Sequence, residues 1–248
     1  MVSFWRMYCF HLRQYFRNSY FLCLLVISSL SLLMYKYLSA YSQGQPISSQ
    51  DVMISSIFGM WSAAVTAAGI LHFQRSQGVL VYLVNSPSSS LLNLMALVSA
   101  PASFGLLAYP LTYVAAGLLN NFYFVEIEMI SFIYILLFWI SALSITYFIA
   151  EIFLLTRNAF VYEDLFVTPL MILSGLFPIS LANNSFLQFL QHLIPISFPV
   201  ALLTGETHFS WLKLLTWFLI LCCWFGFAYK AFRSLVYKIR IQGKVEVM

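Results

Sequence analysis

The amino-acid sequence predicts an all-α integral membrane protein with six transmembrane helices. Of its 248 residues, 62% are hydrophobic and only 8% are charged. A soluble domain carries roughly 25% charged residues, and one soluble core of this length could not bury so much apolar surface. The apolar residues form continuous runs of about 20, the length of a membrane-spanning helix, and not the shorter alternating segments of a transmembrane β-barrel. We therefore expect a single transmembrane domain over residues 1–248.

Residues 3–18 precede the first long apolar run and are interrupted by three arginines. Arg6, Arg13 and Arg17 have the spacing i, i+7 and i+11, which places them on one face of a helix. Aromatic and aliphatic side chains cover much of the remaining surface. This pattern predicts an interfacial helix that buries its apolar side at the membrane boundary and directs its arginines toward lipid phosphates.

Six apolar runs follow, each long enough to cross a membrane. The first carries an interfacial anchor of two tyrosines around Lys36, and the second is rich in small residues that permit close helix packing. Pro101 and Pro110 break or kink the third. The predicted spans are residues 20–40, 52–73, 90–119, 128–155, 165–181 and 210–236.

The segment 183–209, between the fifth and sixth spans, has a different character. It is apolar but short, and Pro195 and Pro199 interrupt it. Such a segment is typical of a re-entrant or interfacial hairpin and not of a seventh span. We expect this hairpin on the outer side of the membrane.

The basic residues lie almost entirely on one side of this arrangement. With six spans, ten of the twelve Lys and Arg residues share the side of both termini, and only Lys36 and Lys213 lie opposite. The positive-inside rule then predicts that both termini are cytoplasmic. We expect the chain in the inner (plasma) membrane of the cell. A seventh span would place the C-terminal basic cluster outside. The net charge of +4 therefore follows from the membrane topology. It indicates membrane lipid as a partner and does not indicate binding to nucleic acid.

Known catalytic and metal-binding motifs are absent from the sequence. It has no P-loop, no H-E-x-x-H and no G-x-S-x-G pattern. Its four histidines are scattered, and its four cysteines lack metal-ligand spacing, so we expect buried thiols at Cys9, Cys23, Cys222 and Cys223. The sequence therefore predicts a protein that is not an enzyme and that holds no metal or cofactor of its own.

Ionisable residues are nearly absent from the predicted spans. Glu151, near the inner end of the fourth span, is the nearest candidate for the mid-membrane acid of an ion-driven carrier. Arg157, Glu163 and Asp164 follow it. This group is either a salt-bridged rim or a docking surface for a cytoplasmic partner. In both cases the usual relay for ion-coupled transport is missing, and the energy must come from elsewhere.

The inner loop after the second span contains a short apolar segment between two breaks. Arg75 and Gly78 precede the hexamer 79–84, which Asn85-Ser86-Pro87 ends. The pattern is that of a short helix at the inner surface, shaped to contact a soluble protein, although a plain connecting loop would share it.

The fifth span ends in the run Ser174-Gly175-Leu176-Phe177-Pro178. Pro178 stops the helix because proline lacks a backbone N–H and blocks helix continuation. Non-helical backbone at membrane depth requires burial in protein or a cavity. This run and the hairpin after it are therefore candidates for a pathway or gate.

Together these stretches resemble the permease subunits of ABC exporters of the ABC-2 type. That family typically has an Arg, a Gly-x-Leu, a further Leu and a Pro in the loop after span two. It also has a Ser-Gly and Phe-Pro run in span five and a Pro in a short outer hairpin. The N-terminal helix and six spans fit as well, so the resemblance covers the whole chain. The matching residues are Arg75, Gly78, Leu80, Leu83 and Pro87, then Ser174, Gly175, Phe177, Pro178 and Pro195.

One stretch departs from the family pattern. After the Phe-Pro pair the family often has a second Leu-Pro and a Trp, where this chain has Ala182-Asn183-Asn184 and Phe186.

The resemblance implies ATP-driven export. Two such permeases, identical or different, would pair above two ATP-binding ABC subunits that supply ATP and Mg²⁺. The loop from Gln74 to Pro87 would be the coupling helix, with Arg157, Glu163 and Asp164 as a second contact. Spans two and five would line an apolar path, gated by the outer hairpin with Pro195 and Pro199, for an amphipathic peptide, hydrophobic drug or lipid-linked molecule.

Two other functions remain open. One is a six-span ion-coupled secondary carrier, for which Glu151 would be the first residue to test. The other is a membrane enzyme or maturation factor, which would need polar residues converging at one depth.

Overall fold

The computed structural model describes residues 4–86, 89–122, 129–155, 159–176 and 185–242. Within these ranges all regular structure is helical: α-helices and one short 3-10 helix, with no strand. The predicted all-α class is therefore confirmed for the described part of the chain.

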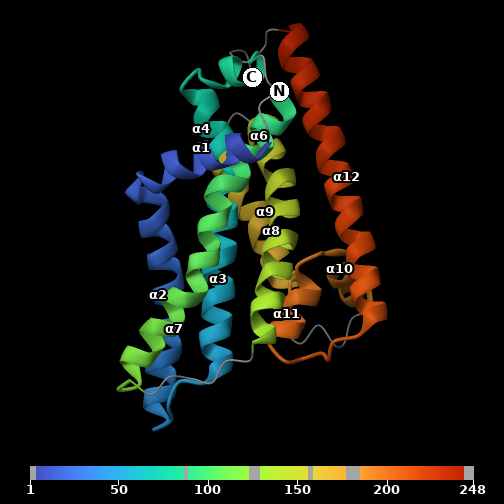
Figure 1. The fold of residues 1–248 in the computed structure, drawn as a ribbon. Coiled ribbons are helices and arrows are strands. Elements are labelled where there is room, and N and C mark those ends of the chain that lie inside the picture. The colour runs from blue at the N-terminus through green and yellow to red at the C-terminus, as the bar shows by residue number, and fades with distance from the viewer. Residues whose placement is uncertain (1–3, 87–88, 123–128, 156–158, 177–184, 243–248) are drawn as a thin grey trace.

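The long helices run roughly parallel, and α1 (Phe4–Phe16) lies crosswise at one end of them (Figure 1). We call this end the α1 end. From it, α2 (Ser19–Ser42) leads to the opposite end, and α3 (Ser49–Ala68) with α4 (Ile70–Ser76) leads back. The short α5 (Leu80–Val84) then joins α4 to the next descending segment.

The second half of the chain continues this alternation. A descending segment comprises α6 (Ser90–Ala102), the 3-10 helix η1 (Ser103–Leu107) and α7 (Ala108–Leu119), and α8 (Ile130–Leu155) returns to the α1 end. Next, α9 (Ala159–Leu173) begins at the α1 end, while α10 (Ser185–Leu193) and α11 (Ser197–Leu203) lie toward the opposite end. Finally, α12 (Trp211–Gln242) runs back to the α1 end.

Within the described residues, five stretches are long and apolar enough to cross a membrane. They match five of the six predicted spans, and the bent pair formed by α10 and α11 would add a sixth if it acts as one span. The axes of that pair differ by 94°. The five are Ser19–Ser42, Ser49–Ser76, Ser90–Leu119, Ile130–Leu154 and Trp211–Tyr237.

The predicted fifth span, 165–181, is described only in part. The helix here is α9, which covers Ala159–Leu173 and has 15 residues. At 1.5 Å per residue it is about 22 Å long, less than the ~30 Å hydrocarbon core. It ends before Gly175, whose φ of +82° is a left-handed conformation that stops a helix. Residues 177–181 of the predicted span lie outside the described residues.

The break predicted in the third span is confirmed, although the two prolines act differently. Pro101 lies in the last turn of α6, and the backbone then tightens into η1. Pro110 is in the first turn of α7, where a missing N–H costs no helical hydrogen bond. Gly105 lets η1 approach α3 closely, since a Cβ there would lie 3.2 Å from the Cα of Met60.

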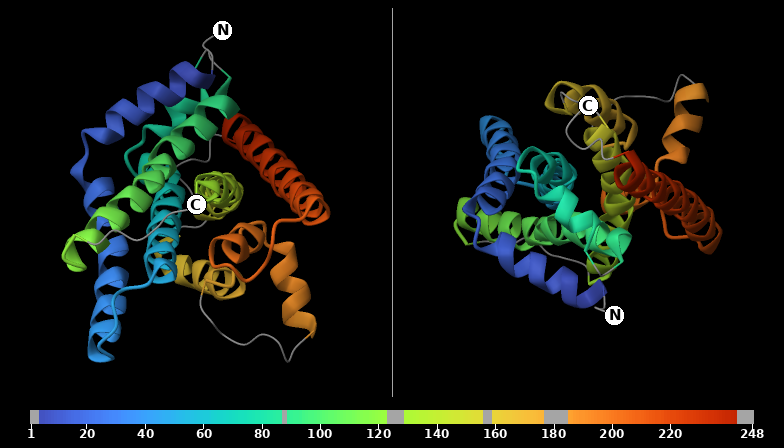
Figure 2. Two further views of the ribbon diagram at one scale, coloured as in Figure 1. Left: turned by 60° about the horizontal axis from the view of Figure 1, so that its bottom comes forward. Right: turned by 90° about the horizontal axis from the view of Figure 1, so that it is seen from above.

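The centre of the bundle is formed by α3, α6 with η1 and α7, and α8. In an 18-residue apolar stretch of each, 72%, 67% and 56% of the residues are buried. The corresponding share is 17% in α2 and in α12. Figure 2 shows α2 and α12 at the periphery. The predicted small face of the second span is confirmed, because Ala64, Ala67 and Ala68 are buried and Gly59 leaves no room for a Cβ beside Ser29.

The expectation of buried cysteines is wrong. All four thiols are free and exposed on the chain. Three of them, Cys23, Cys222 and Cys223, lie on the peripheral helices α2 and α12. In a membrane an apolar side chain gains little from facing protein instead of lipid, so apolar character did not predict burial.

Candidate functional site

The loop between α4 and α6 begins with a helix stop that the sequence encodes. The N–H of Gly78 donates to the carbonyl of Arg75 at 3.0 Å, and the N–H of Val79 donates to that of Gln74 at 3.0 Å. These two bonds form a Schellman motif, whose left-handed position Gly78 fills with a φ of +72°. Gly78 therefore ends α4 and directs the chain into α5.

The short helix α5 has one buried and one exposed side. Leu80 and Val84, one turn apart, are completely buried. Tyr82 points away and is 78% exposed, beside the exposed Val79. We call the exposed pair Val79 and Tyr82 the α5 patch.

The predicted coupling residues are thus divided between core and surface. Gly78 is exposed, Leu83 is partly buried against the core, and Leu80 belongs to the core itself. Pro87 lies outside the described residues. Sequence reasoning missed Tyr82, although the i, i+4 pair Leu80 and Val84 already implies that residue 82 is on the opposite side of a helix.

Hydrogen bonds connect α5 to its neighbours. Ser90 Oγ donates to the carbonyl of Val84 at 2.7 Å, and the Asn93 amide donates to that of Leu83 at 3.5 Å. The other end of Asn93, its Oδ1, accepts from His11 Nε2 at 3.2 Å. One side chain of α6 therefore links α5 to α1.

The helix α1 is held to the bundle by a buried stripe. Met7, His11 and Tyr15 repeat every four residues and are buried, and the Tyr15 hydroxyl accepts from Gln74 Nε2 of α4 at 3.3 Å. Burial lowers the pKa of His11, partly offset by its hydrogen bond to Asn93. Burial also raises the pKa of Tyr15 to about 12, and the bond from Gln74 opposes that rise.

The three arginines of the predicted interfacial helix are exposed. Arg6 and Arg13 belong to α1, and Arg17 directly follows it. Their common face is turned away from the buried stripe of α1.

Arg75 has a structural partner. Its Nη1 donates to the carbonyl of Leu154 at 2.7 Å, near the C-terminal end of α8. The last carbonyls of a helix lack partners within it and carry partial negative charge, so a guanidinium here stabilises the end of α8. Arg75 therefore joins α4 to α8.

Glu151 lies one turn before that end. It is 3% exposed, and its Oε1 has no hydrogen-bond partner among the described residues. Arg157 lies outside the described residues, as do the side chains of Glu163 and Asp164 in α9.

Of the predicted gate residues, Ser174 and Gly175 lie at the end of α9, and Pro195 and Pro199 lie in the bent pair. Ser174 is buried, and its Oγ donates to the carbonyl of Met171 at 2.6 Å and accepts from the N–H of Leu176 at 3.3 Å. A Cβ at Gly175 would lie 3.0 Å from Gln191 Nε2, so the end of α9 meets α10 here. Phe177 and Pro178 lie outside the described residues.

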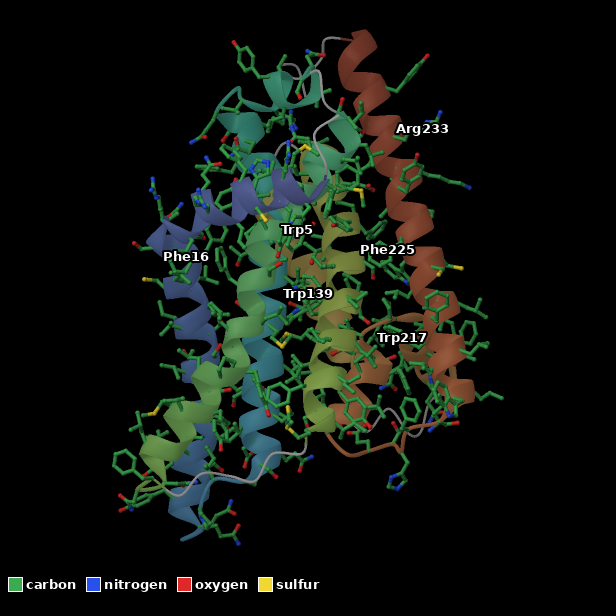
Figure 3. The ribbon with its side chains drawn as sticks, viewed as in Figure 1. Trp5, Phe16, Trp139, Trp217, Phe225 and Arg233 are labelled. Atoms are coloured by element: carbon green, nitrogen blue, oxygen red, sulfur yellow. The ribbon has the colours of Figure 1, made fainter. Side chains whose placement is uncertain are left out.

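Tryptophans of α12 hold the bend itself. Trp217 Nε1 donates to the carbonyl of Pro195 at 2.9 Å and to Ser141 Oγ at 3.0 Å, and Trp224 Nε1 donates to the carbonyl of Leu193 at 3.0 Å. Figure 3 shows Trp217 between α12 and the bent pair. These indoles satisfy carbonyls that the broken helix leaves free, as backbone at membrane depth requires. Pro199 is buried within α11.

A cavity of about 500 Å³ lies where the bent pair meets α12. Its lining combines apolar side chains, such as Phe198 and Trp217, with Glu206 and Lys213.

Groups able to hold a metal are absent from the described residues, where no three His, Cys, Asp or Glu side chains converge. No family model, curated protein or solved structure matches this chain. The resemblance to ABC-2 permeases therefore rests on the sequence motifs alone.

Proposed function

We propose that this chain is the transmembrane permease subunit of an ATP-driven ABC exporter, moving amphipathic or hydrophobic substrates out of the cytoplasm. The α5 patch carries this proposal. It exposes Tyr82 on a short helix and Val79 directly before that helix, whose other side is anchored in the core. A soluble partner that pushes this patch would also move α6 and α1, because Asn93 bonds to both α5 and α1.

In this proposal the chain crosses the membrane six times. The segment from α9 to α11 starts at the α1 end and reaches the opposite end, where α12 begins, so together it makes one crossing (Figure 1). Both termini then share a side. Arg6 and Arg13 of α1, Arg17 directly after it and Arg75 of α4 all lie at that end. The positive-inside rule therefore makes this end cytoplasmic. At the other end Lys36 is paired with Asp51 at 3.2 Å.

The remaining parts of the exporter would come from partners. An ATP-binding subunit with its Mg²⁺ would dock on the α5 patch. A second permease, the same chain or a sister, would complete the path. The peripheral helices α2 and α12 have the exposed apolar surface that such a partner or lipid would cover. Substrate would leave past the bent pair, whose cavity combines apolar and charged walls.

The test compares two matched substitutions in the full chain, expressed in its native host. Tyr82→Asp alters the α5 patch, and Tyr41→Asp alters an equally exposed tyrosine at the opposite end of the bundle. Both side chains are more than 70% exposed, at 78% and 72%, so neither change should affect folding. We expect Tyr82→Asp to reduce the ATP-binding subunit that copurifies, measured by azido-ATP photolabelling, by about tenfold or more. Tyr41→Asp should have no such effect.

Full photolabelling together with normal ATP-dependent transport in the Tyr82→Asp chain would refute the proposal. The buried Leu80 is unsuitable for this test, because a charge there would destabilise the core.

An ion-coupled carrier is the second candidate, and the burial of Glu151 without a partner for Oε1 favours it. Transport in vesicles that persists without ATP, collapses with the proton gradient and is lost in Glu151→Gln would decide for this alternative.

A further inference from the structure

A groove of about 670 Å³ separates α1 from η1. On the α1 side it is lined by a stripe at helical spacing that includes Cys9, Leu12 and Phe16, with Arg13 and Arg17 beside them. On the η1 side Phe104, Leu106 and Leu107 complete an apolar wall. The groove is therefore apolar along its length and cationic along one edge.

Direct contacts hold the two walls in place. The Tyr8 hydroxyl donates to Ser103 Oγ at 2.6 Å, and the rings of Phe16 and Phe104 lie 6.3 Å apart. Phe16 lies where α1 meets α2 (Figure 3). The buried stripe of α1 also fixes this helix on α6. The groove is thus formed by the fold itself and requires no ligand to assemble it.

The two arginines at its edge have no acidic partner in the described part of the chain. They are one turn apart on exposed positions, an arrangement of like charges that costs a few tenths of a kcal/mol on an isolated helix. Asp51 is the first acidic residue in the sequence, and it pairs with Lys36 at the opposite end of the bundle. Among the described residues no carboxylate lies within ion-pair distance of Arg13 or Arg17.

The shape and chemistry of the groove select its ligand. A phosphate matches a pair of guanidinium groups, which bind it through charge-assisted hydrogen bonds. The exposed apolar walls, including Phe16 and Leu107, would be satisfied by a hydrocarbon chain. Only an amphiphile provides both, and the groove lies beside helices that are apolar enough to cross a membrane.

We propose that this groove binds an anionic phospholipid, with the phosphate between Arg13 and Arg17 and one acyl chain along Leu12, Phe16 and Leu107. The bound lipid clamps α1 against η1, the point at which the third span is broken. This inference concerns a lipid site and stands whether or not the chain is an exporter.

The test uses the full chain, purified in a non-ionic detergent and exchanged into nanodiscs. Native mass spectrometry counts bound phosphatidylglycerol against phosphatidylcholine with the same acyl chains. Arg13→Gln and Arg17→Gln each remove one charge from the groove. Arg6→Gln is the matched control, because Arg6 lies on the same face of α1, two turns from Arg13, and does not line the groove.

We expect retention of phosphatidylglycerol over phosphatidylcholine, and a loss of phosphatidylglycerol affinity of about tenfold with Arg13→Gln or Arg17→Gln. Arg6→Gln should change the affinity less than about twofold, since it contributes only long-range attraction. Equal losses from all three arginines would mean diffuse attraction to the surface and would overturn the proposal. So would equal binding of the two lipids.

A further variant tests the acyl-chain part without changing charge. Cys9→Trp places a large side chain in the groove at an exposed position, and we expect it to displace the lipid while the arginines remain. Inorganic phosphate at the same concentration should not raise the melting temperature of the unmodified chain. An unchanged lipid count in Cys9→Trp, or stabilisation by inorganic phosphate alone, would show a simple anion site and refute lipid binding.

Discussion

His11 makes the attachment of α1 sensitive to pH. Its ring is buried, and its Nε2 donates to Asn93 Oδ1. The orientation of the Asn93 amide is set by its bond to the Leu83 carbonyl. Burial lowers the pKa of His11 from its ordinary value of 6.5, because a buried imidazolium loses solvation.

This shift gives a pH dependence with a definite sign. The unfolded chain protonates His11 near pH 6.5, whereas the folded chain does so only at lower pH. Between these two values the unfolded state binds more protons, so stability is complete above pH 6.5 and falls as the pH drops below it. We expect the melting temperature in detergent to fall between pH 7.5 and pH 5.5, and this fall to be smaller in His11→Gln. Parallel pH profiles for the two chains would contradict the assignment.

Single residues also show where sequence reasoning reached its limit. The positions of Gly78 and the hexamer after it were predictable, because a glycine that ends a helix and a short apolar run are both recognisable in the sequence. The inward direction of Leu80 was not, since both sides of α5 are apolar in sequence. In a soluble protein polarity would have marked the outer side. Here only the fold distinguishes Leu80 from Tyr82.

At the scale of elements, the bent pair depends on α12. A 94° bend leaves backbone carbonyls without helical partners, and Trp217 and Trp224 donate to two of them. The sequence predicted a broken segment from Pro195 and Pro199. It did not predict these donors, which lie more than twenty residues further along and belong to a different helix.

Removing the Trp217 donor should therefore loosen the bend. Trp217→Phe keeps the aromatic ring but leaves the buried Pro195 carbonyl unpaired, at a cost of about 1–3 kcal/mol. We expect a lower melting temperature and faster amide hydrogen exchange in α11. Trp211→Phe is the control, because Trp211 lies on the same helix and is 78% exposed. Equal effects of the two substitutions would remove Trp217 from this role.

At the scale of the whole molecule, composition and apolar run length predicted the helical class and most of the long apolar helices. Apolar run length located five spans to within a few residues, since a membrane dictates helix length directly. The predicted fifth span is the exception, because the helix there, α9, ends at Leu173 and has only 15 residues. Run length does not distinguish one broken crossing from a short span followed by a hairpin, because both have the same apolar content.

The number of crossings can be measured at four exposed positions in a chain whose native cysteines, all exposed, are replaced by alanine. Tyr41→Cys and Glu206→Cys lie at the end opposite α1, whereas Gln77→Cys and Ser234→Cys lie at or toward the α1 end. If α9 to α11 make one crossing, α12 returns the chain to the side of α4. An impermeant maleimide added to whole cells should then label the first two cysteines and reach the other two only after permeabilisation.

Labelling of Gln77→Cys and Ser234→Cys from opposite sides would require an odd number of crossings between them and would refute the six-crossing topology. Labelling of Gln77→Cys and Ser234→Cys, at the α1 end, from outside would instead preserve the six crossings and reverse the proposed orientation. That orientation depends on the arginines of α1 and α4.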